Sequence, residues 1–207
     1  MTGDLIVLVP DKDTEETLKA VLVRTESLRI RRIRFGTLVH PYKDSGCFST
    51  GVELLRTQLS TWAHGLVVFD RAWEGAPSTN PADLEHKVQG ELDLMRPGWG
   101  RCFVIDPELE IWLFSDSPHV DEALGWSGRS PSLREWLRQR GQWPEGSLKP
   151  PDPERAFREA MYKVRIPAAA SVFAGVARRV SLTRCQDRAF RGLVHQLQAW
   201  FPETGQP

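Results

Sequence analysis

The stretch Leu5-Ile6-Val7-Leu8-Val9-Pro10-Asp11-Lys12-Asp13 sets the expected fold class. Its first five residues form a continuous apolar run rich in β-branched residues, which is typical of a strand buried on both faces. The run leads at once into an acidic loop. A helix is expected next, because Asp13 and Glu16 have the spacing of a capping box. The chain therefore begins with a strand, an acidic loop and a helix.

Later stretches repeat this order. Gly65 to Phe69 reads as a buried strand that ends on Asp70, and Cys102 to Ile105 reads as another that runs into Asp106. Strand segments are also expected within residues 30–39, and helices are expected to start at Thr50 and at Asn80-Pro81. Strands that alternate with helices predict βαβ crossovers and a mainly parallel sheet. We therefore expect a Rossmann-like α/β fold.

The second half has a different texture. Three pairs, each resembling an N-cap followed by Pro at the first helical position, predict short helices: Ser117-Pro118, Ser130-Pro131 and Asp152-Pro153. Helical spacing also runs through residues 168–180 and 187–201. We expect an α/β domain over residues 1–125, with a C-terminal helical extension over residues 126–207 packed on it.

Composition limits the classes of function. The 207 residues include 27 basic and 27 acidic side chains, so no global field draws the chain towards nucleic acid or lipid. No apolar run approaches the length of a membrane span, and the start lacks a secretory pattern, so we expect a cytoplasmic protein that does not bind membranes. Three scattered cysteines indicate core thiols rather than disulfides.

Charge is concentrated locally in one stretch. Arg29, Arg31, Arg32 and Arg34 alternate with apolar residues, as they would along a strand with one basic edge. This stretch is either a solvated strand face or a phosphate-binding stripe.

Carboxylates follow all three predicted buried strands. The groups concerned are Asp11 and Asp13, Asp70 and Glu74, and Asp106, Glu108 and Glu110. Loops at the carboxyl ends of parallel strands lie together, so these side chains could converge. Mg²⁺ or Mn²⁺ would offset their repulsion and could promote displacement at phosphorus. The alternatives are solvated acids, a helix cap at Asp13 and an ion pair between Asp70 and Arg71.

This order of elements resembles the Toprim domain of topoisomerases, primases and overcoming-lysogenization-defect nucleases. That resemblance implies a first-loop Glu and a later Asp-x-Asp that together hold Mg²⁺. In this sequence the Glu position falls on Pro10 or is replaced by Asp11. The later motif begins at Asp70, its second Asp is replaced by Ala72, and Glu74 is the nearest substitute.

A second resemblance covers most of the chain. Three motifs in order look like small Toprim-like proteins of prokaryotic anti-phage islands, including methylation-associated defence systems. They are Val67-Val-Phe-Asp-Arg71, the segment from Asp106 to Asp116 with Glu110-x-Trp112-x-x-x-Asp116, and the tail Arg184-Cys185-x-Asp187-x-Ala-Phe190. The resemblance implies that Glu108, Glu110, Trp112 and Asp116 lie near the acidic cluster.

Other signals are weaker. His40, His64 and His119 are each more typical of surface or capping residues than of catalytic or metal-binding ones. No P-loop, dinucleotide-binding or nucleophile-elbow motif occurs, so no organic cofactor is expected. Of the eight tryptophans, Trp73, Trp99 and Trp143 lie near Gly and Pro, either as core lids or as exposed docking groups.

Two hypotheses follow. In the first, the chain is a metal-dependent phosphodiester-cleaving component of a defence system, with Asp11, Asp70, Glu74 and Glu108 as metal ligands and Asp70, Glu74, Glu108 and Glu110 as catalytic residues. In the second, it is an inactive adaptor that keeps the fold and binds partner proteins of the defence complex. Carboxylates converging around room for an ion favour the first; separated or Arg-capped carboxylates favour the second.

Overall fold

Parallel strands and the helices around them form the described part of the chain. The computed structural model describes residues 3–115, 117 and 119–203. The strands are β1 (Gly3–Val9), β2 (Phe35–Val39), β3 (Trp62–Asp70) and β4 (Gly100–Ile105). The helices are α1 (Lys12–Leu22), α2 (Thr25–Leu28), α3 (Lys43–Ser49), α4 (Gly51–Arg56), α5 (Pro81–Met95), α6 (Glu110–Leu113), α7 (His119–Ala123), α8 (Leu133–Gln139), α9 (Pro153–Val164), α10 (Ala170–Arg179), the 3-10 turn η1 (Leu182–Arg184) and α11 (Arg188–Trp200).

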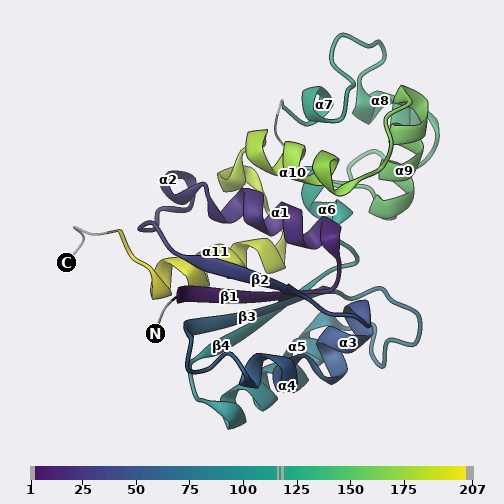
Figure 1. Cartoon of the computed structure of the whole chain (residues 1–207). Coiled ribbons are helices and arrows are strands. Elements are labelled where there is room, and N and C mark those ends of the chain that lie inside the picture. The colour runs from purple at the N-terminus through teal and green to yellow at the C-terminus, as the bar shows by residue number, and fades with distance from the viewer. Residues whose placement is uncertain (1–2, 116, 118, 204–207) are drawn as a thin grey trace.

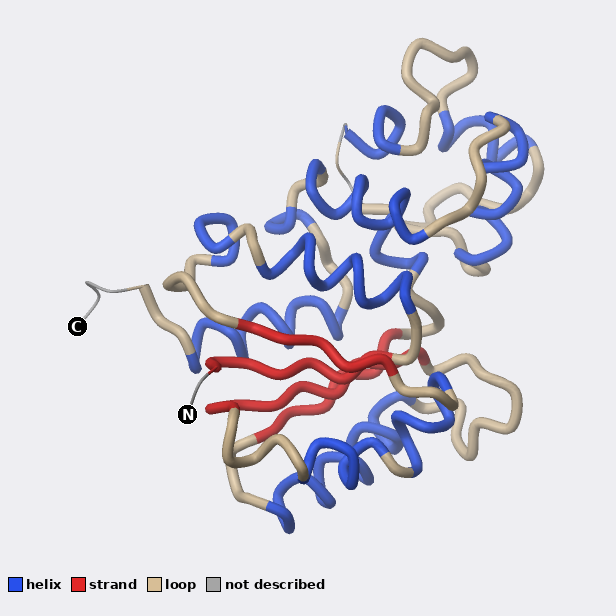
Figure 2. The backbone as a smooth tube through the Cα atoms, in the orientation of Figure 1, coloured by secondary structure: helices blue, strands red, loops and turns tan. Residues whose placement is uncertain are grey.

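β1 lies inside the sheet. Over the described residues the strand order is β2-β1-β3-β4, and every pairing is parallel. Leu5 is paired with Phe35 of β2 on one side and with His64 of β3 on the other. The sheet is sandwiched between helices (Figure 2). The predicted Rossmann-like α/β class is confirmed.

Helices cover both faces of the sheet. Figure 1 shows α1, α10 and α11 on one side and α3, α4 and α5 on the other. Alternate residues of β1 face these two layers: Leu5, Val7 and Val9 belong to the first core, and Ile6 and Leu8 to the second. All five side chains are buried. Burial on both faces explains why the strand is apolar at every position from Leu5 to Val9.

Several predicted helix starts are confirmed. The Asn80 side chain accepts a hydrogen bond from the Ala82 amide at the start of α5, and the Asp152 side chain accepts one from the Arg155 amide at the start of α9. In both helices Pro occupies the first turn. Cap and proline together mark a helix start that can be read from sequence.

Two other predicted starts are each wrong by two residues. α1 is capped by Asp11, which accepts from the Thr14 amide at 2.8 Å, rather than by Asp13. α8 is capped by Ser132, which forms a capping box with Glu135, rather than by Ser130. In each case two residues that can form a cap lie close together in the sequence, and the helix is capped by the one that was not predicted.

The basic stretch is not a strand. Arg29 ends α2, and residues 31–34 are irregular before β2 begins at Phe35. Asp4 accounts for this conformation, because its carboxylate accepts from the Arg34 amide at 2.7 Å and from the Arg31 guanidinium at 2.8 Å. The strand predicted within residues 30–39 is therefore wrong for residues 31–34 and correct for Phe35–Val39. α3, which follows β2, was not predicted.

Two of the three singled-out tryptophans are core residues. Trp99 and Trp143 are buried. The indole N–H of Trp99 donates to the Trp62 carbonyl and that of Trp143 to the Ser147 carbonyl, each at 3.0 Å. Both tryptophans are therefore core residues whose indole N–H groups have hydrogen-bond acceptors, and they cover the ends of helices and strands. Trp73 keeps partial exposure.

A hydrogen bond joins two distant sequence motifs. The indole N–H of Trp112 donates to Asp187 Oδ1 at 2.8 Å, and its ring meets that of Phe190 edge to face at 5.1 Å. The same Asp187 oxygen accepts from the Phe190 amide and so caps α11. This contact fixes α11 against α6, with α11 lying over β4.

The C-terminal segment returns to the sheet. α10 packs along α1, and α11 packs on β4, so residues beyond 125 complete one helix layer of the α/β unit. A domain boundary near residue 125 stays a prediction. Among the described residues, no helix has both the length and the apolar character needed to cross a bilayer.

We expect Asp187→Ala to lower the free energy of unfolding by about 2 kcal/mol, because it removes a helix cap and leaves the buried Trp112 indole without its acceptor. Asp187→Asn keeps an oxygen at this position and should cost less. Urea unfolding followed by circular dichroism measures both. Equal midpoints for the Ala variant and the wild type would contradict the proposed role of this contact.

Candidate functional site

The acidic loops meet at one edge of the sheet. Because the strands are parallel, β1, β2, β3 and β4 all end on the side that lies to the right in Figure 1. The strand order reverses direction between β1 and β3, and crevices for ligands in such sheets form at this switch point. Asp11 follows β1 and Asp70 ends β3. The structure therefore places these two acids on either side of the switch point.

Asp70 turns inward. Its Oδ1 atom is buried and has no hydrogen-bond partner in the described residues, although the residue as a whole keeps partial exposure. Burial raises the pKa of Asp70 well above its usual range, and nearby Asp44, Glu110 and Asp11 add to this rise. The expected pairing with Arg71 is absent, so Asp70 favours its neutral form.

Asp44 is a site residue that the sequence analysis missed. It lies in the first turn of α3, and its Oδ1 accepts from the Asp70 backbone amide at 2.9 Å. Burial is the main cause that raises the pKa of Asp44, and Asp11 raises it further. Asp44 could have been predicted from its position, because it follows shortly after the strand expected to end at Val39.

His40 holds the loop that positions Asp44. It is buried, and its Nδ1 accepts from the Tyr42 backbone amide at 3.1 Å, so Nε2 carries the proton and lies 3.1 Å from the Thr50 hydroxyl. Burial lowers the pKa of His40. A Cβ on Gly46 would come within 2.0 Å of the ring. His40 is thus a neutral structural residue, and only Gly fits beside it.

The first-loop acids serve α1. Asp11 caps the helix through the Thr14 amide. Asp13 lies inside the first turn, where burial raises its pKa and Asp11 adds to the effect. Pro10, the position where the resemblance expects Glu, carries no ligating atom in its side chain.

The loop after β4 is tied to the loop after β3. Arg71 Nε donates to Asp106 Oδ1 at 2.5 Å, and the Ala72 amide donates to the Pro107 carbonyl at 3.0 Å. Asp106 is therefore neutralised by an arginine instead of facing the other acids. The pair is partly solvent-exposed, so its main effect is to fix the geometry of the two loops.

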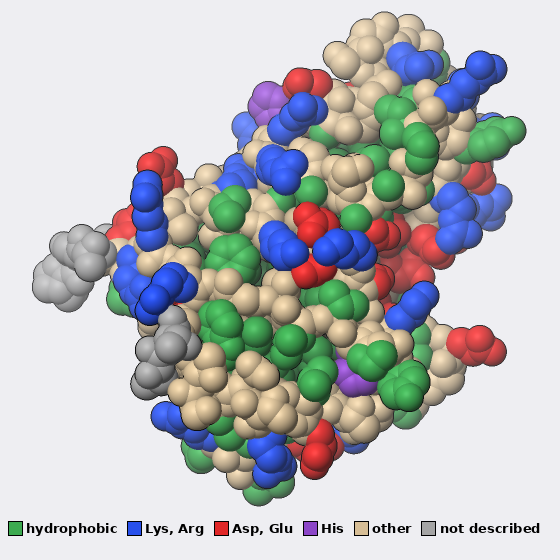
Figure 3. Space-filling model, in the orientation of Figure 1, with side chains coloured by type: hydrophobic (Ala, Val, Ile, Leu, Met, Phe, Trp, Pro, Cys, Tyr) green, Lys and Arg blue, Asp and Glu red, His purple; other side chains and the backbone are tan. Residues whose placement is uncertain are grey.

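Glu108 and Glu110 lie at the start of α6. Burial raises the pKa of Glu110 to about 7, and Glu108, Glu154 and Asp13 contribute. Burial also raises the pKa of Glu108, with Glu154 and Asp152 of the α9 region as its acidic neighbours. Glu110 lies close enough to Asp70 to raise the pKa of that carboxyl, and Glu154 of α9 is an acidic neighbour of both Glu108 and Glu110. Figure 3 shows acidic side chains gathered where these helices meet the edge of the sheet.

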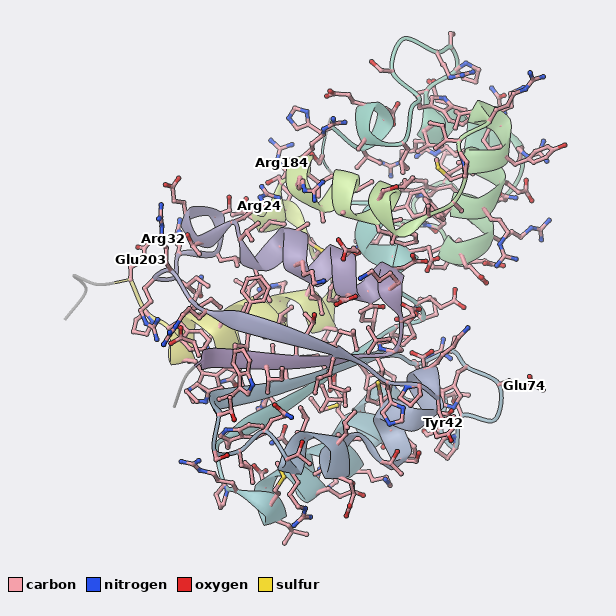
Figure 4. All side chains as sticks on the ribbon, in the orientation of Figure 1. Arg24, Arg32, Tyr42, Glu74, Arg184 and Glu203 are labelled. Atoms are coloured by element: carbon pink, nitrogen blue, oxygen red, sulfur yellow. The ribbon has the colours of Figure 1, made fainter. Side chains whose placement is uncertain are left out.

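Glu74 is placed apart from the other predicted ligands. It is exposed near the tip of the loop between β3 and α5, and Figure 4 shows it pointing into solvent. Together with Tyr42 and Trp73 it borders an open hollow of about 390 Å³. Asp116, which the resemblance also assigns to the cluster, lies outside the described residues.

Among the residues that the structure describes, the carboxylates form no metal site from protein ligands alone. Oxygen donors suit Mg²⁺ or Mn²⁺ in kind. In arrangement they do not suit either ion, because within residues 3–115, 117 and 119–203 no three Asp, Glu, His or Cys side chains are grouped closely enough to hold one. The four predicted metal ligands have separate positions. Asp11 caps α1, and Asp70 has a buried Oδ1 atom. Glu74 is exposed at a loop tip, and Glu108 has acidic neighbours in the α9 region.

Glu110 gives the site a measurable pH dependence. Its pKa is about 7 in the folded protein and about 4.3 in an unfolded chain. The stability that neutral Glu110 contributes is therefore present below about pH 4 and lost as pH rises through about 7. From pH 5 to pH 8, the wild type should lose roughly 1 to 3 kcal/mol more stability than Glu110→Gln.

Urea unfolding at the two pH values measures this difference, and the same change at exposed Glu145 is the control. Parallel pH profiles for the wild type and Glu110→Gln would contradict the burial of Glu110.

Comparisons with known proteins give no match to set beside this geometry. No family model matches the chain, and neither the curated proteins nor the solved structures include one that is significantly similar to it.

Proposed function

We propose that this chain is a non-catalytic, Toprim-like component of a prokaryotic anti-phage defence system of the methylation-associated kind, and that it binds partner proteins through the carboxyl edge of its sheet. One observation carries the proposal: the acids at this edge are dispersed into separate structural roles. Asp11 caps a helix, Asp106 pairs with Arg71, and Glu74 projects into solvent. Pro10 and Ala72 stand where the Toprim resemblance expects metal-binding acids.

The edge also offers a surface suited to protein contact. Tyr42 is 73% exposed, and Trp73 packs its ring against Phe48 and Phe69 at 5.7 Å while keeping partial exposure. Large aromatic side chains supported from below are the usual anchors of protein interfaces. The hollow between them has Lys43 and Glu74 on its rim, which would give a partner both signs of charge to pair with.

The loop carrying Tyr42 is held in one conformation. Lys43 adopts a left-handed φ of 49°, a region that costs a non-glycine residue free energy. The His40 contacts to Tyr42 and Thr50 hold the backbone around it. A rigid loop loses little conformational entropy when a partner binds.

Membership in a defence system rests on the resemblance of three separated motifs. The last two are in contact, because Trp112 of the Asp106–Asp116 segment donates to Asp187 of the tail and packs on Phe190. This contact supports treating them as parts of one signature.

Binding of partner proteins can be tested by co-expressing the chain with the products of its neighbouring genes. Tyr42→Ala should weaken the copurified complex by at least tenfold in Kd, about 1.4 kcal/mol, because it removes an exposed aromatic anchor. Tyr162→Ala is the matched control, since Tyr162 is 88% exposed on α9 and does not border the hollow at Tyr42 and Trp73. Equal affinity for both variants would contradict this interface.

Metal-dependent phosphodiester cleavage is the second candidate function. It is favoured by the buried Asp70 Oδ1 without a partner, close to Asp44 and Glu110. Mg²⁺ is often held by only one or two carboxylates together with the phosphates of a substrate. An ion that arrives with a nucleic-acid phosphate would meet these acids, and it would stabilise the charge that develops at phosphorus.

A melting experiment separates the two functions. For a non-catalytic adaptor, we expect millimolar Mg²⁺ or Mn²⁺ to leave the Tm unchanged in the wild type, in Asp70→Asn and in the loop-tip control Glu74→Gln. A Tm increase with metal that Asp70→Asn abolishes and Glu74→Gln preserves would favour the nuclease and overturn the adaptor.

A further inference from the structure

A second hollow lies away from the acidic edge. It is bordered by α2, η1 and α11 and has a volume of about 380 Å³. In Figure 1, α2 lies towards the end of the sheet opposite the acidic loops. Figure 4 shows the same separation, with Arg24, Arg32 and Arg184 on one side of the molecule and Tyr42 and Glu74 on the other. This hollow is therefore independent of the proposed partner-binding edge.

The lining of this hollow is basic. Arg29 contributes from the end of α2, and Arg191 and His195 contribute from successive turns of α11. No Asp or Glu is among the described residues that line it. Arg29 and Arg191 take part in none of the ion pairs found in the described part of the chain. Two arginine residues thus border the same space, and no carboxylate of the described residues forms an ion pair with either of them.

The walls of the hollow are joined to each other. The side chain of Gln198 on α11 donates to the Leu28 carbonyl at 2.9 Å, which ties α11 to the end of α2. Leu28 and Leu182 are buried on either side. Arg29 itself is held in a left-handed conformation, with its amide donating back to Glu26 and Thr25. The two arginines therefore project from a fixed frame.

The chemistry of the lining selects its ligand. Guanidinium groups match phosphate oxygens through paired N–H donors. Buried Phe190 and Leu182 supply an apolar floor, and Gln186, Ser27 and Thr183 supply neutral polar groups. A volume of this size is in the lower range for small-ligand sites. We propose that the hollow binds the phosphate of a nucleotide, either free or as one unit of a nucleic-acid strand.

The hollow bears on the prediction that the basic stretch binds phosphate. The stretch from Arg29 to Arg34 is no strand edge, and Arg31 is engaged by Asp4. Of the arginines in this stretch, only Arg29 lines the hollow. The second arginine of the lining is Arg191, which is distant in the sequence. The phosphate-binding surface that the stretch suggested is thus built from two separate segments.

Two exposed substitutions test the proposal. Arg191→Gln keeps a good helix former on α11, and Arg29→Gly suits the left-handed φ of 55° at that position. The control is Arg138→Ala, an exposed arginine on α8. The probes are AMP, ATP and a fluorescent 12-nucleotide DNA strand at low salt, and circular dichroism melting confirms that each variant is folded.

We expect the wild type and Arg138→Ala to bind at least one probe with the same Kd, and each site variant to bind it at least tenfold more weakly. Inorganic phosphate should compete. Binding of AMP or ATP identifies a free nucleotide as the ligand, whereas binding of the DNA strand alone, with a salt slope reduced by about one in the variants, identifies a strand. Absence of binding to all probes, or binding that neither site variant weakens, would overturn the proposal.

Discussion

Hydrogen bonding of β1 on both sides governs the geometry of the rest of the molecule. Its parallel pairing with β2 and β3 makes the carboxyl ends of the strands meet at one edge. Its burial on both faces requires a helix layer on each side. The loops that follow the strands carry several acids, so backbone topology brings like charges together that would otherwise separate.

Groups of the protein itself offset these charges in three ways. Asp11 satisfies a helix N-terminus, where a negative charge is favourable. Asp106 is neutralised by Arg71. Asp70 and Glu110 are partly buried, and burial raises the pKa of each, which shifts both side chains towards the neutral form. Helix capping, ion pairing and protonation each reduce the repulsion between acidic side chains at this edge. The acids can therefore lie together although Pro10 and Ala72 occupy positions where metal-binding acids would be expected.

α11 connects the two chemically distinct ends of the protein. At its start, Asp187 binds Trp112, and Arg188 forms an ion pair with Glu85 of α5 at 2.7 Å. Further along, Arg191 and His195 line the basic hollow against α2. The net charge of zero conceals this separation, because acidic and basic groups cancel in the total while occupying different surfaces.

The amino-acid sequence by itself determined the strands β1, β3 and β4, the start of α5, the alternation of strands with helices and the parallel sheet. These follow from local signals, namely continuous apolar runs, cap residues and prolines, which act over a few neighbouring residues. It also placed Asp11, Asp70, Asp106, Glu108 and Glu110 at one edge, because parallel topology alone implies that.

Only the tertiary structure decided what those side chains do. Arg71 forms an ion pair with Asp106 rather than with Asp70, and Asp44 accepts a hydrogen bond from the Asp70 amide. Arg29 and Arg191, which are far apart in the sequence, line the same hollow. The basic stretch is bound by the Asp4 carboxylate and is irregular rather than a strand. Each outcome depends on a partner at least 26 residues away in sequence, and the periodicity of a single segment carries no information about such partners.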